Sequence, residues 1–383
     1  MPISATSSAT SAATAATFLL LLTLTSGNPP PPHPFTKIYA FGDSYTDTGN
    51  TISATGPSAF SYVSNLPYGR TFFHRPTNRY SDGRLVIDFL SESLSLPYLP
   101  PYLTTRGKSN ASAGVNFAVA GATAIRHKFF VKNNLTLAVT PQSLQTQLRW
   151  FSKMLKGVKC ESAVASREAC EAVFRDALVW VGEIGANDYA YTIGSMVTGE
   201  TVRRRAIRSV TEFVEALLKK GAKYMVVQGL PTTGCLTLAM YLSPETDRDD
   251  IGCVATANNQ SYIHNTMLQT NIQDLRKKYP EAVIVYADYY NAYRSVMKNA
   301  SKLGFRELYK VCCGSSGEDY NFDLTATCGS QYASSCESPS EYINWDGVHL
   351  TEAMYKVVSD MFFNGSFTHP PFKYLLRSKQ NLS

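Results

Sequence analysis

The sequence lacks the short motifs that identify several common classes of enzyme. It contains no H-E-x-x-H, no G-x-G-x-x-G and no G-x-S-x-G, so zinc proteases, dinucleotide-dependent enzymes and α/β-hydrolases with a nucleophile elbow are not the first candidates. Its eight cysteines form no C-x-x-C pair, which leaves zinc and thioredoxin-like sites without their usual spacing. We therefore expect neither a metal nor a cofactor.

Long runs of charged or apolar residues are also scarce. The formal net charge is +6, but acids and bases are intermixed, and the one dense basic run, at residues 203–205, is typical of a solvated helix face. Nucleic-acid binding is therefore not expected. The apolar run at residues 18–24 is much shorter than the ~20 residues that cross a bilayer, so no integral membrane span is expected either.

The amino-terminal segment has the features of a targeting sequence. Residues 1–17 are rich in Ser, Thr and Ala, the apolar run follows, and small residues stand at Ser26 and Gly27. Residues 1–27 therefore resemble a signal peptide. No Lys or Arg precedes the apolar run, and a Ser-rich start without acidic residues also suits plastid targeting, which we keep as the alternative.

Cysteines and glycosylation acceptors favour the secretory route over the plastid. An even number of cysteines without metal-binding spacing favours disulfide bonds, whose pairing the sequence leaves open. The cysteines are Cys160, Cys170, Cys235, Cys253, Cys312, Cys313, Cys328 and Cys336. The N-x-S/T acceptors are Asn110, Asn134, Asn259, Asn299, Asn364 and Asn381. We expect a secreted glycoprotein of the extracellular space or cell wall.

Strand-like and helical segments alternate along the chain. Continuous apolar runs, typical of strands buried on both faces, occupy residues 37–41, 177–181, 224–227 and 282–286. Helical periodicity occurs at 83–96, 201–220, 255–279, 290–298 and 351–362. Since no repeat or long linker divides the chain after the amino-terminal segment, we predict one three-layer α/β/α domain over residues 28–383, with a central, mainly parallel sheet.

The first predicted strand ends in a turn that could present a nucleophile. Gly42 lets the chain bend sharply just before Ser44. A serine needs a base to take its proton, so a histidine oriented by a carboxylate must lie nearby in the fold. Of the six histidines, His349 alone has a carboxylate within four residues, and Asp346 lies three positions before it. Taken singly, Ser44 also suits a helix cap, and residues 346–351 a surface loop.

Two further segments could supply hydrogen-bond donors for an oxyanion. Asn187 follows the predicted strand at 177–181, and Gly121 lies in a small-residue segment where a backbone N–H can approach closely. In isolation, Asn187 also suits a turn and Gly121 a packing position. Clusters of tyrosine at 189–191 and 286–293 could line an acyl pocket, with a place in the core as the alternative.

Taken together and in order, these segments resemble the plant GDSL esterase/lipases of the SGNH hydrolase family. The matching blocks are residues 41–50, residues 114–121, residues 185–188 and residues 346–349, and shorter matches occur at 81–84, 234–235 and 312–314. Tyr45 departs from the Leu that gives the family its name, which concerns the pocket more than proton transfer.

The resemblance implies a fold and a set of roles. It implies an SGNH-hydrolase fold of the flavodoxin-like type and a carboxylic ester hydrolase in which Ser44 attacks the ester, His349 relays the proton and Asp346 orients His349. The oxyanion would be held by the Ser44 and Gly121 backbone N–H groups and the Asn187 side chain.

Several functional alternatives stay open. An acyltransferase would use the same triad, and a catalytically silent carbohydrate-binding glycoprotein would keep the fold. The expected partner is a small-molecule or lipid ester, with lipid, acetyl and phenolic esters all candidates. We expect a monomer.

Overall fold

The computed structural model describes residues 1–2, 34–54, 58–105, 112–135, 140–158, 160, 167–315 and 320–380. The chain divides into two compact units, Met1–Pro32 and His33–Ser383. The fold described below is that of the second unit. Almost all of the predicted signal peptide lies outside the described residues, so the boundary between residues 27 and 28 stays a prediction.

A six-stranded sheet lies at the centre of this unit, in the order β10-β5-β4-β3-β1-β2. Five of its strands are parallel, and β10 pairs antiparallel with β5 at one edge. The strands are β1 Lys37–Phe41, β2 Gly114–Asn116, β3 Ala177–Val181, β4 Tyr224–Gln228, β5 Val283–Ala287 and β10 Thr368–His369. All four predicted strands are present, and the mainly parallel sheet is confirmed.

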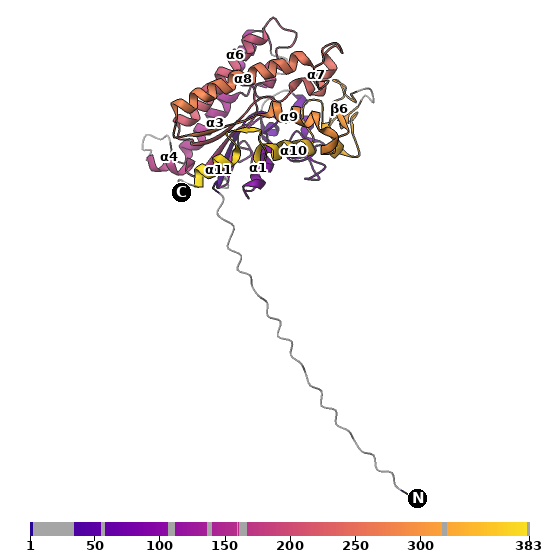
Figure 1. Ribbon diagram of the computed structural model, residues 1–383, viewed down its shortest axis with the longest axis horizontal. Helices are drawn as coiled ribbons and strands as arrows, with labels where there is room; N and C mark the ends of the chain where they lie inside the picture. Colours follow the sequence, from indigo (N-terminus) through magenta and orange to yellow (C-terminus); the bar gives the residue numbers. More distant parts are fainter. Residues whose placement is uncertain are drawn as a thin grey trace. The chain divides into compact units, whose positions relative to one another are not determined.

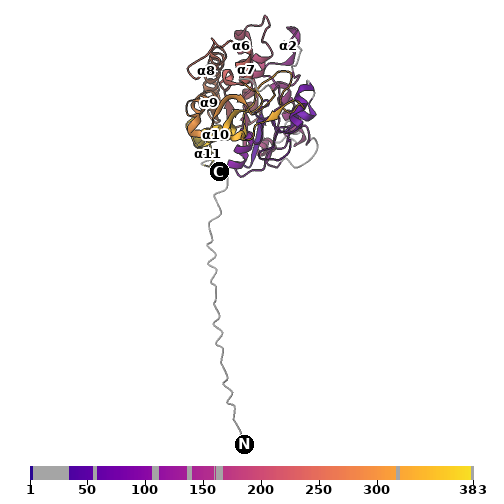
Figure 2. The ribbon, with the colours of Figure 1, turned by 90° about the vertical axis from the view of Figure 1, so that its right-hand side faces the viewer.

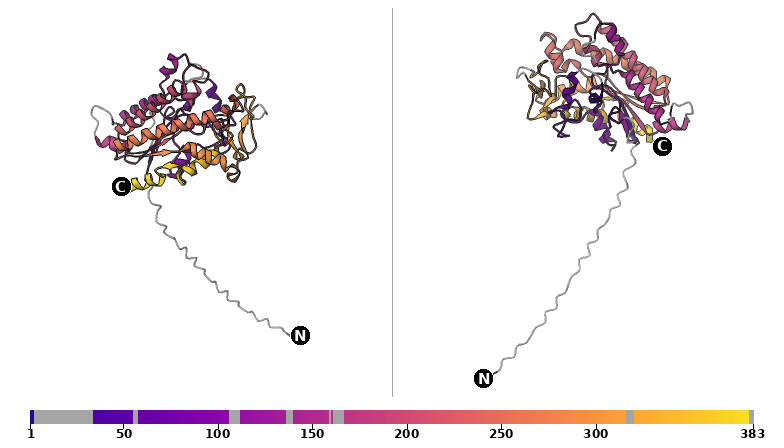
Figure 3. Two further views of the ribbon diagram at one scale, coloured as in Figure 1. Left: turned by 45° about the horizontal axis from the view of Figure 1, so that its top comes forward. Right: turned by 180° about the vertical axis from the view of Figure 1, so that it is seen from behind.

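Helices cover both faces of the sheet, as predicted. Described helices are α1 Val86–Ser93, α2 His127–Lys132, α3 Leu144–Gly157, α4 Arg167–Phe174, α5 Ala186–Ala190, α6 Gly199–Lys219, α7 Thr237–Leu242, α8 Ala255–Lys278, α9 Tyr289–Lys298, α10 Glu352–Phe363 and α11 Phe372–Gln380. Figures 1 and 3 show α3, α6 and α8 on one side, and α1, α9, α10 and α11 on the other. In Figure 2, α6 and α8 lie at the top and α11 near the bottom.

The alternation of side chains along each strand explains this division. Phe41, Val181 and Val227 pack in one cluster with residues of α3, α6 and α8. Their neighbours Ala40 and Trp180 point to the opposite face and pack with α1, α9, α10 and α11. Successive strand residues face opposite sides, so a strand covered on both sides must be apolar throughout. This is the pattern that the sequence displays.

Short elements and disulfides complete the unit. Two small sheets pair β6 Glu307–Val311 with β9 Tyr342–Asn344 and β7 Cys313–Gly314 with β8 Ser334–Ser335. Short 3₁₀ helices are η1 Asn50–Ser53, η2 Ser58–Ser64, η3 Thr233–Cys235, η4 Ala300–Leu303 and η5 Pro339–Glu341. No helix in the described part of the chain is long and apolar enough to cross a bilayer.

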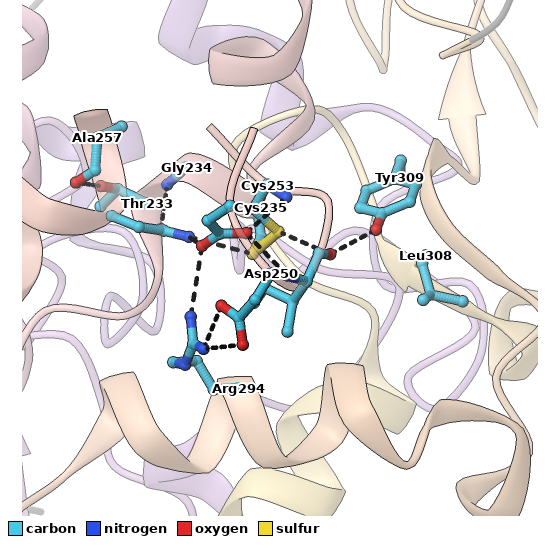
Figure 4. The surroundings of a disulfide bond; sticks show 12 residues. Thr233, Gly234, Cys235, Asp250, Cys253, Ala257, Arg294, Leu308 and Tyr309 are labelled. Atoms are coloured by element: carbon cyan, nitrogen blue, oxygen red, sulfur yellow. Dashed lines mark hydrogen bonds and ion pairs between the residues drawn. A yellow bond between two sulfur atoms is a disulfide. The ribbon is translucent and has the colours of Figure 1, made fainter. Parts of the chain in front are cut away.

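All eight cysteines form disulfides, which confirms the prediction and fixes the pairing. The bonds are Cys160–Cys170, Cys235–Cys253, Cys312–Cys336 and Cys313–Cys328. Figure 4 shows that Cys235–Cys253 lies beside the ion pair of Asp250 with Arg294, whose shortest N–O distance is 2.6 Å. Arg294 projects from α9, so the ion pair holds the loop before α8 against that helix, while the disulfide joins the same loop to η3.

Candidate active site

Ser44 lies in a tight turn directly after β1, at the carboxyl edge of the sheet. Gly42 has a φ of 145°, a conformation that side-chain-bearing residues rarely adopt. The backbone N–H of Gly42 donates to Gln147 Oε1 at 3.0 Å, and Gln147 Nε2 donates to Gly42 O at 2.7 Å. The fully buried Gln147 of α3 therefore fixes the bend before Ser44. Nothing in the sequence indicated this role, because the two residues are 105 positions apart.

Ser44, His349 and Asp346 form one hydrogen-bonded chain. His349 Nε2 lies 2.7 Å from Ser44 Oγ, although 305 positions separate the two residues. His349 Nδ1 lies 2.8 Å from Asp346 Oδ2 and 2.9 Å from Asp346 Oδ1. The carboxylate thus fixes the imidazole with Nε2 facing the serine, which is the arrangement that a general base needs.

The loop between β9 and α10 positions Asp346 and His349 relative to each other. Asp346 Oδ1 accepts the backbone N–H of His349 at 2.8 Å, and the N–H of Trp345 donates to His349 O at 2.7 Å. Gly347 has a φ of 97°, and a Cβ there would lie 2.3 Å from the Phe322 ring. The tight loop that the spacing of three residues predicted is therefore present, and it requires glycine at this position.

Three tyrosines contact this loop: Tyr68 and Tyr80, which the sequence did not single out, and Tyr45, which it connected with the pocket. Tyr68 OH donates to Asp346 Oδ2 at 2.7 Å, and Tyr45 OH donates to Val348 O at 2.7 Å. The Tyr80 ring centroid lies 4.4 Å from that of His349. Burial would raise the pKa of Asp346, but the charge of His349 and the hydrogen bonds from His349 and Tyr68 outweigh it and lower that pKa. Asp346 is therefore held as the carboxylate.

Gly121 and Asn187 lie at the ends of the strands on either side of β1. Gly121 has a φ of 72°, and a Cβ there would lie 2.6 Å from the Phe60 ring and 2.7 Å from Tyr191 OH. Asn187 Nδ2 donates to Asp43 Oδ2 at 3.0 Å and to Ala122 O at 3.1 Å. The Asn187 amide thus joins the residue before Ser44 to the residue after Gly121.

Both hydrogens of the Asn187 amide are engaged in these two bonds. An amide nitrogen has only two hydrogens. Donation to an oxyanion therefore requires one of the two bonds to be shared or released. The bond to the Asp43 carboxylate is charge-assisted, and the bond to the Ala122 carbonyl is neutral, so the second is the weaker.

The remaining residues of the motif blocks tie the three strand ends together. Asp47 Oδ2 accepts the N–H of Ala120 at 3.0 Å, and Asn50 Nδ2 donates to Ala118 O at 2.8 Å. Asp188 accepts the N–H groups of Ala124 and Ile125, each at 2.8 Å. Burial raises the pKa of Asp188 to about 7. Hydrogen bonds from these side chains, rather than a regular helix or strand, hold the loops of the site in place.

The tyrosine clusters belong mainly to the core. Tyr189, Tyr286, Tyr289 and Tyr293 are buried, so the alternative weighed for them is correct. Tyr191 is the exception, because its hydroxyl donates to Gly121 O at 3.0 Å. Among the described residues, no group of three or more His, Cys, Asp or Glu side chains could hold a metal ion.

Comparison with known proteins places this geometry in a family. Residues 38–362 match the model of the GDSL-like lipase/acylhydrolase family. A GDSL esterase/lipase of Arabidopsis thaliana is 58% identical over 91% of both chains. Acetylajmalan esterase 2 of Rauvolfia serpentina is 40% identical over 84% of this chain and 88% of that protein.

A solved structure resembles the chain weakly. It is a catalytic mutant of an acetylxylan esterase from Geobacillus stearothermophilus, 12% identical over 86% of this chain and 93% of that chain, with a TM-score of 0.38. A likeness of this degree supports no inference about substrate. The family model and the curated relatives, in contrast, cover nearly the whole described unit. The chain therefore belongs to the GDSL-like lipase/acylhydrolase family, whose members are carboxylic ester hydrolases.

Proposed function

We propose that this protein is a secreted serine esterase or lipase in which Ser44, His349 and Asp346 form the catalytic triad. The observation that carries the proposal is the 2.7 Å contact between Ser44 Oγ and His349 Nε2, with Nδ1 of the same ring on Asp346. A serine hydroxyl is a weak nucleophile until a positioned base takes its proton. This contact supplies that base.

The reaction follows from the positions of these groups. His349 Nε2 takes the Ser44 proton as Oγ bonds to the ester carbonyl carbon, and the carbonyl oxygen becomes an oxyanion. The backbone N–H groups of Ser44 and Gly121 and the amide of Asn187 would donate to that oxyanion. His349 then returns the proton to the leaving alcohol, and a water molecule attacks the acyl-enzyme with His349 again as base.

Replacement of Ser44 by Ala tests the proposal. We expect Ser44→Ala to lower kcat for p-nitrophenyl acetate or butyrate by about 10⁴-fold or more, as removal of a triad nucleophile does. The matched control is Ser91→Ala, because Ser91 is also buried but lies in α1, where its hydroxyl bonds only to the helix backbone. Full activity of the Ser44→Ala protein would refute the triad.

Two further measurements separate the alternatives. A fluorophosphonate probe should label the wild type at Ser44, whereas a catalytically silent glycoprotein would stay unlabelled. Incubation with an acyl donor and an excess of alcohol should yield free acid rather than new ester, and predominant ester formation would identify an acyltransferase. A panel of acetyl, lipid and phenolic esters then identifies the acyl group, with acetyl esters first because one relative is named an acetylajmalan esterase.

The disulfides and the acceptor asparagines support secretion. Disulfide bonds persist in oxidising compartments. Asn134, Asn259, Asn299 and Asn364 are exposed, and Asn110 and Asn381 lie outside the described residues. We expect the secreted protein to begin near residue 28 and to lose mass on treatment with an N-glycosidase. An unglycosylated protein recovered from plastids would contradict this.

A further inference from the structure

Two buried carboxyl groups meet beneath Ser44 at the ends of neighbouring strands. In the β1–β3 pair, Phe41 faces Val181, and the N–H of Gly182 donates to Phe41 O at 2.8 Å. Asp43 and Glu183 each follow two residues after that pair, so the register brings them side by side. Asp43 is 1% exposed and Glu183 is 0% exposed.

The two carboxyl groups have different surroundings. Asp43 accepts the N–H of Tyr45 at 3.1 Å and the amide of Asn187 at 3.0 Å, and its carboxyl lies against that of Glu183. Neither oxygen of the Glu183 carboxyl accepts a hydrogen bond from an N–H or O–H group of the described residues. The charged groups that act on this pair are His349, Asp47 and Asp188. The titratable hydroxyl groups near it belong to Tyr45, Tyr191, Tyr289 and Tyr355.

Such a pair must share a proton. Two carboxylates in contact repel each other strongly in a buried site, and a hydrogen bond between two carboxyl groups requires one of them to be the neutral acid. The donors on Asp43 favour its ionised form, whereas Glu183 receives none. Burial and then the charge of Asp43 raise the pKa of Glu183 well above its usual value, which agrees with Glu183 as the acid.

We propose that Glu183 is a positioning residue for the oxyanion hole: as the neutral acid it donates a hydrogen bond to the Asp43 carboxylate, which holds the Asn187 amide in place. The inference rests on the proposed role of Asn187. Because Asp43 is a charged acceptor, its hydrogen bond with the Asn187 amide is stronger than the bond from the same amide to Ala122 O. The Asn187 amide hydrogen that bonds Ala122 O is then the one that turns to the oxyanion, while the bond to Asp43 keeps the amide aligned.

Glu183→Leu and Glu183→Gln test the hydrogen bond. Leu donates nothing to Asp43, so Asn187 loses its alignment, and we expect kcat to fall about 10- to 100-fold with KM within about twofold. The Gln amide still donates, so this variant should recover most of the lost kcat. A rise in KM alone, an unchanged kcat in Glu183→Leu or an equal loss in both variants would overturn the proposal.

A double-mutant cycle shows whether Glu183 acts through Asn187. In the Asn187→Ala background, Glu183→Leu should lower kcat by less than about threefold, because the amide it positions is gone. The matched control is a second cycle, which combines Asn187→Ala with Tyr68→Phe. Because Tyr68 bonds Asp346 and not Asn187, the effects of these two substitutions on kcat should be additive. Additive effects of Glu183→Leu and Asn187→Ala would refute the positioning role. These measurements compare variants of an active enzyme, so their failure leaves the result of Ser44→Ala unaffected.

A second variant covers the case in which Glu183→Leu does not fold. Asp43→Asn removes the charge that Glu183 is proposed to stabilise, and kcat should fall about tenfold or more. Since Glu183 acts through Asp43, adding Glu183→Gln to Asp43→Asn should cause no further loss. A further loss comparable with the first would show that Glu183 acts by another route.

Discussion

At the scale of single residues, the hydroxyl of Tyr68 extends the triad by one member. It bonds the Asp346 oxygen that also faces His349, and it comes from a segment 278 positions earlier in the chain. Tyr68 is buried and its ring packs edge-on against Trp345. Its hydroxyl therefore has little freedom to leave the carboxylate, and Asp346 is held from two sides.

Tyr68→Phe removes this hydroxyl and keeps the ring. We expect kcat for p-nitrophenyl butyrate to fall about tenfold, because a hydrogen bond to a charged group contributes about 1.5–3 kcal/mol. Steady-state kinetics measure the change. The control is Tyr80→Phe, whose lost hydroxyl bonds Phe60 O rather than the triad. Equal losses in both variants would indicate a general packing defect.

The residues of the proposed triad were predictable, and those that position them were not. Ser44, Asp346 and His349 could be identified because their chemistry demands a carboxylate close to a histidine, and only one histidine has it. Tyr68, Gln147 and Glu183 lie far in sequence from the groups they bond, and tyrosine, glutamine and glutamate are common in many settings. Only the fold brings each of them to its partner.

At the scale of elements, adjacent cysteines tie a disulfide-bonded loop to the strand that leads into Asp346. The N–H of Cys312 donates to Asn344 O at 3.0 Å, and the N–H of Cys313 donates to Trp345 O at 2.7 Å. Two disulfides, Cys312–Cys336 and Cys313–Cys328, start from these residues. The backbone just before Asp346 is therefore hydrogen-bonded to a segment that two disulfides constrain.

Removing one of these bonds should affect both stability and activity. We expect Cys313→Ser with Cys328→Ser to lower the free energy of unfolding by about 2–4 kcal/mol and to reduce kcat at temperatures where the protein stays folded. Cys160→Ser with Cys170→Ser should cost similar stability and leave kcat unchanged, because Cys160 follows α3 at the end away from the loops around Ser44. Urea unfolding and steady-state kinetics measure both effects. Equal kcat in the two double variants would contradict the anchoring role.

Helices and strands were predictable where their pattern of apolar residues is long. The four strands found from the sequence are five residues long and apolar, but β2 has three residues and β10 two, which is too short for periodicity. The helix α3 was missed although Leu144, Leu148, Phe151 and Leu155 recur at helical spacing. The helix predicted at 83–96 is shorter, since α1 begins at Val86, after the Ser81–Arg84 segment whose Asp82 accepts the N–H of Glu352 at 2.7 Å.

At the scale of the whole molecule, the buried acids make stability depend on pH. Burial raises the pKa of Asp188 to about 7, from an ordinary 3.8, and it raises the pKa of Glu183 well above its usual value. An acid whose pKa is raised by folding stabilises the fold fully below its ordinary value and loses this contribution as pH rises through the raised value. Asp346 acts in the opposite sense, because its lowered pKa contributes stability above the ordinary value that is lost at lower pH.

The directions of these pKa shifts predict that the free energy of unfolding is largest at a pH somewhat below 7. We expect the thermal unfolding midpoint to be about 5 °C higher at pH 5.5 than at pH 8, measured by differential scanning calorimetry at constant ionic strength. Glu183→Gln should show a smaller difference, because its amide does not titrate. A midpoint that rises steadily from pH 5.5 to pH 8 would contradict the assignment of raised pKa values.

The distance along the chain between Ser44 and His349 has a consequence for how the protein is made. A nascent polypeptide that has not yet reached β9 already carries the proposed nucleophile and all three proposed oxyanion donors, but it lacks the proposed base. If the proposed triad acts, fragments left by incomplete translation, or by proteolysis before this strand, have no means of cleaving esters. Turnover is then expected only when the last part of the chain has been synthesised and has docked beside the first.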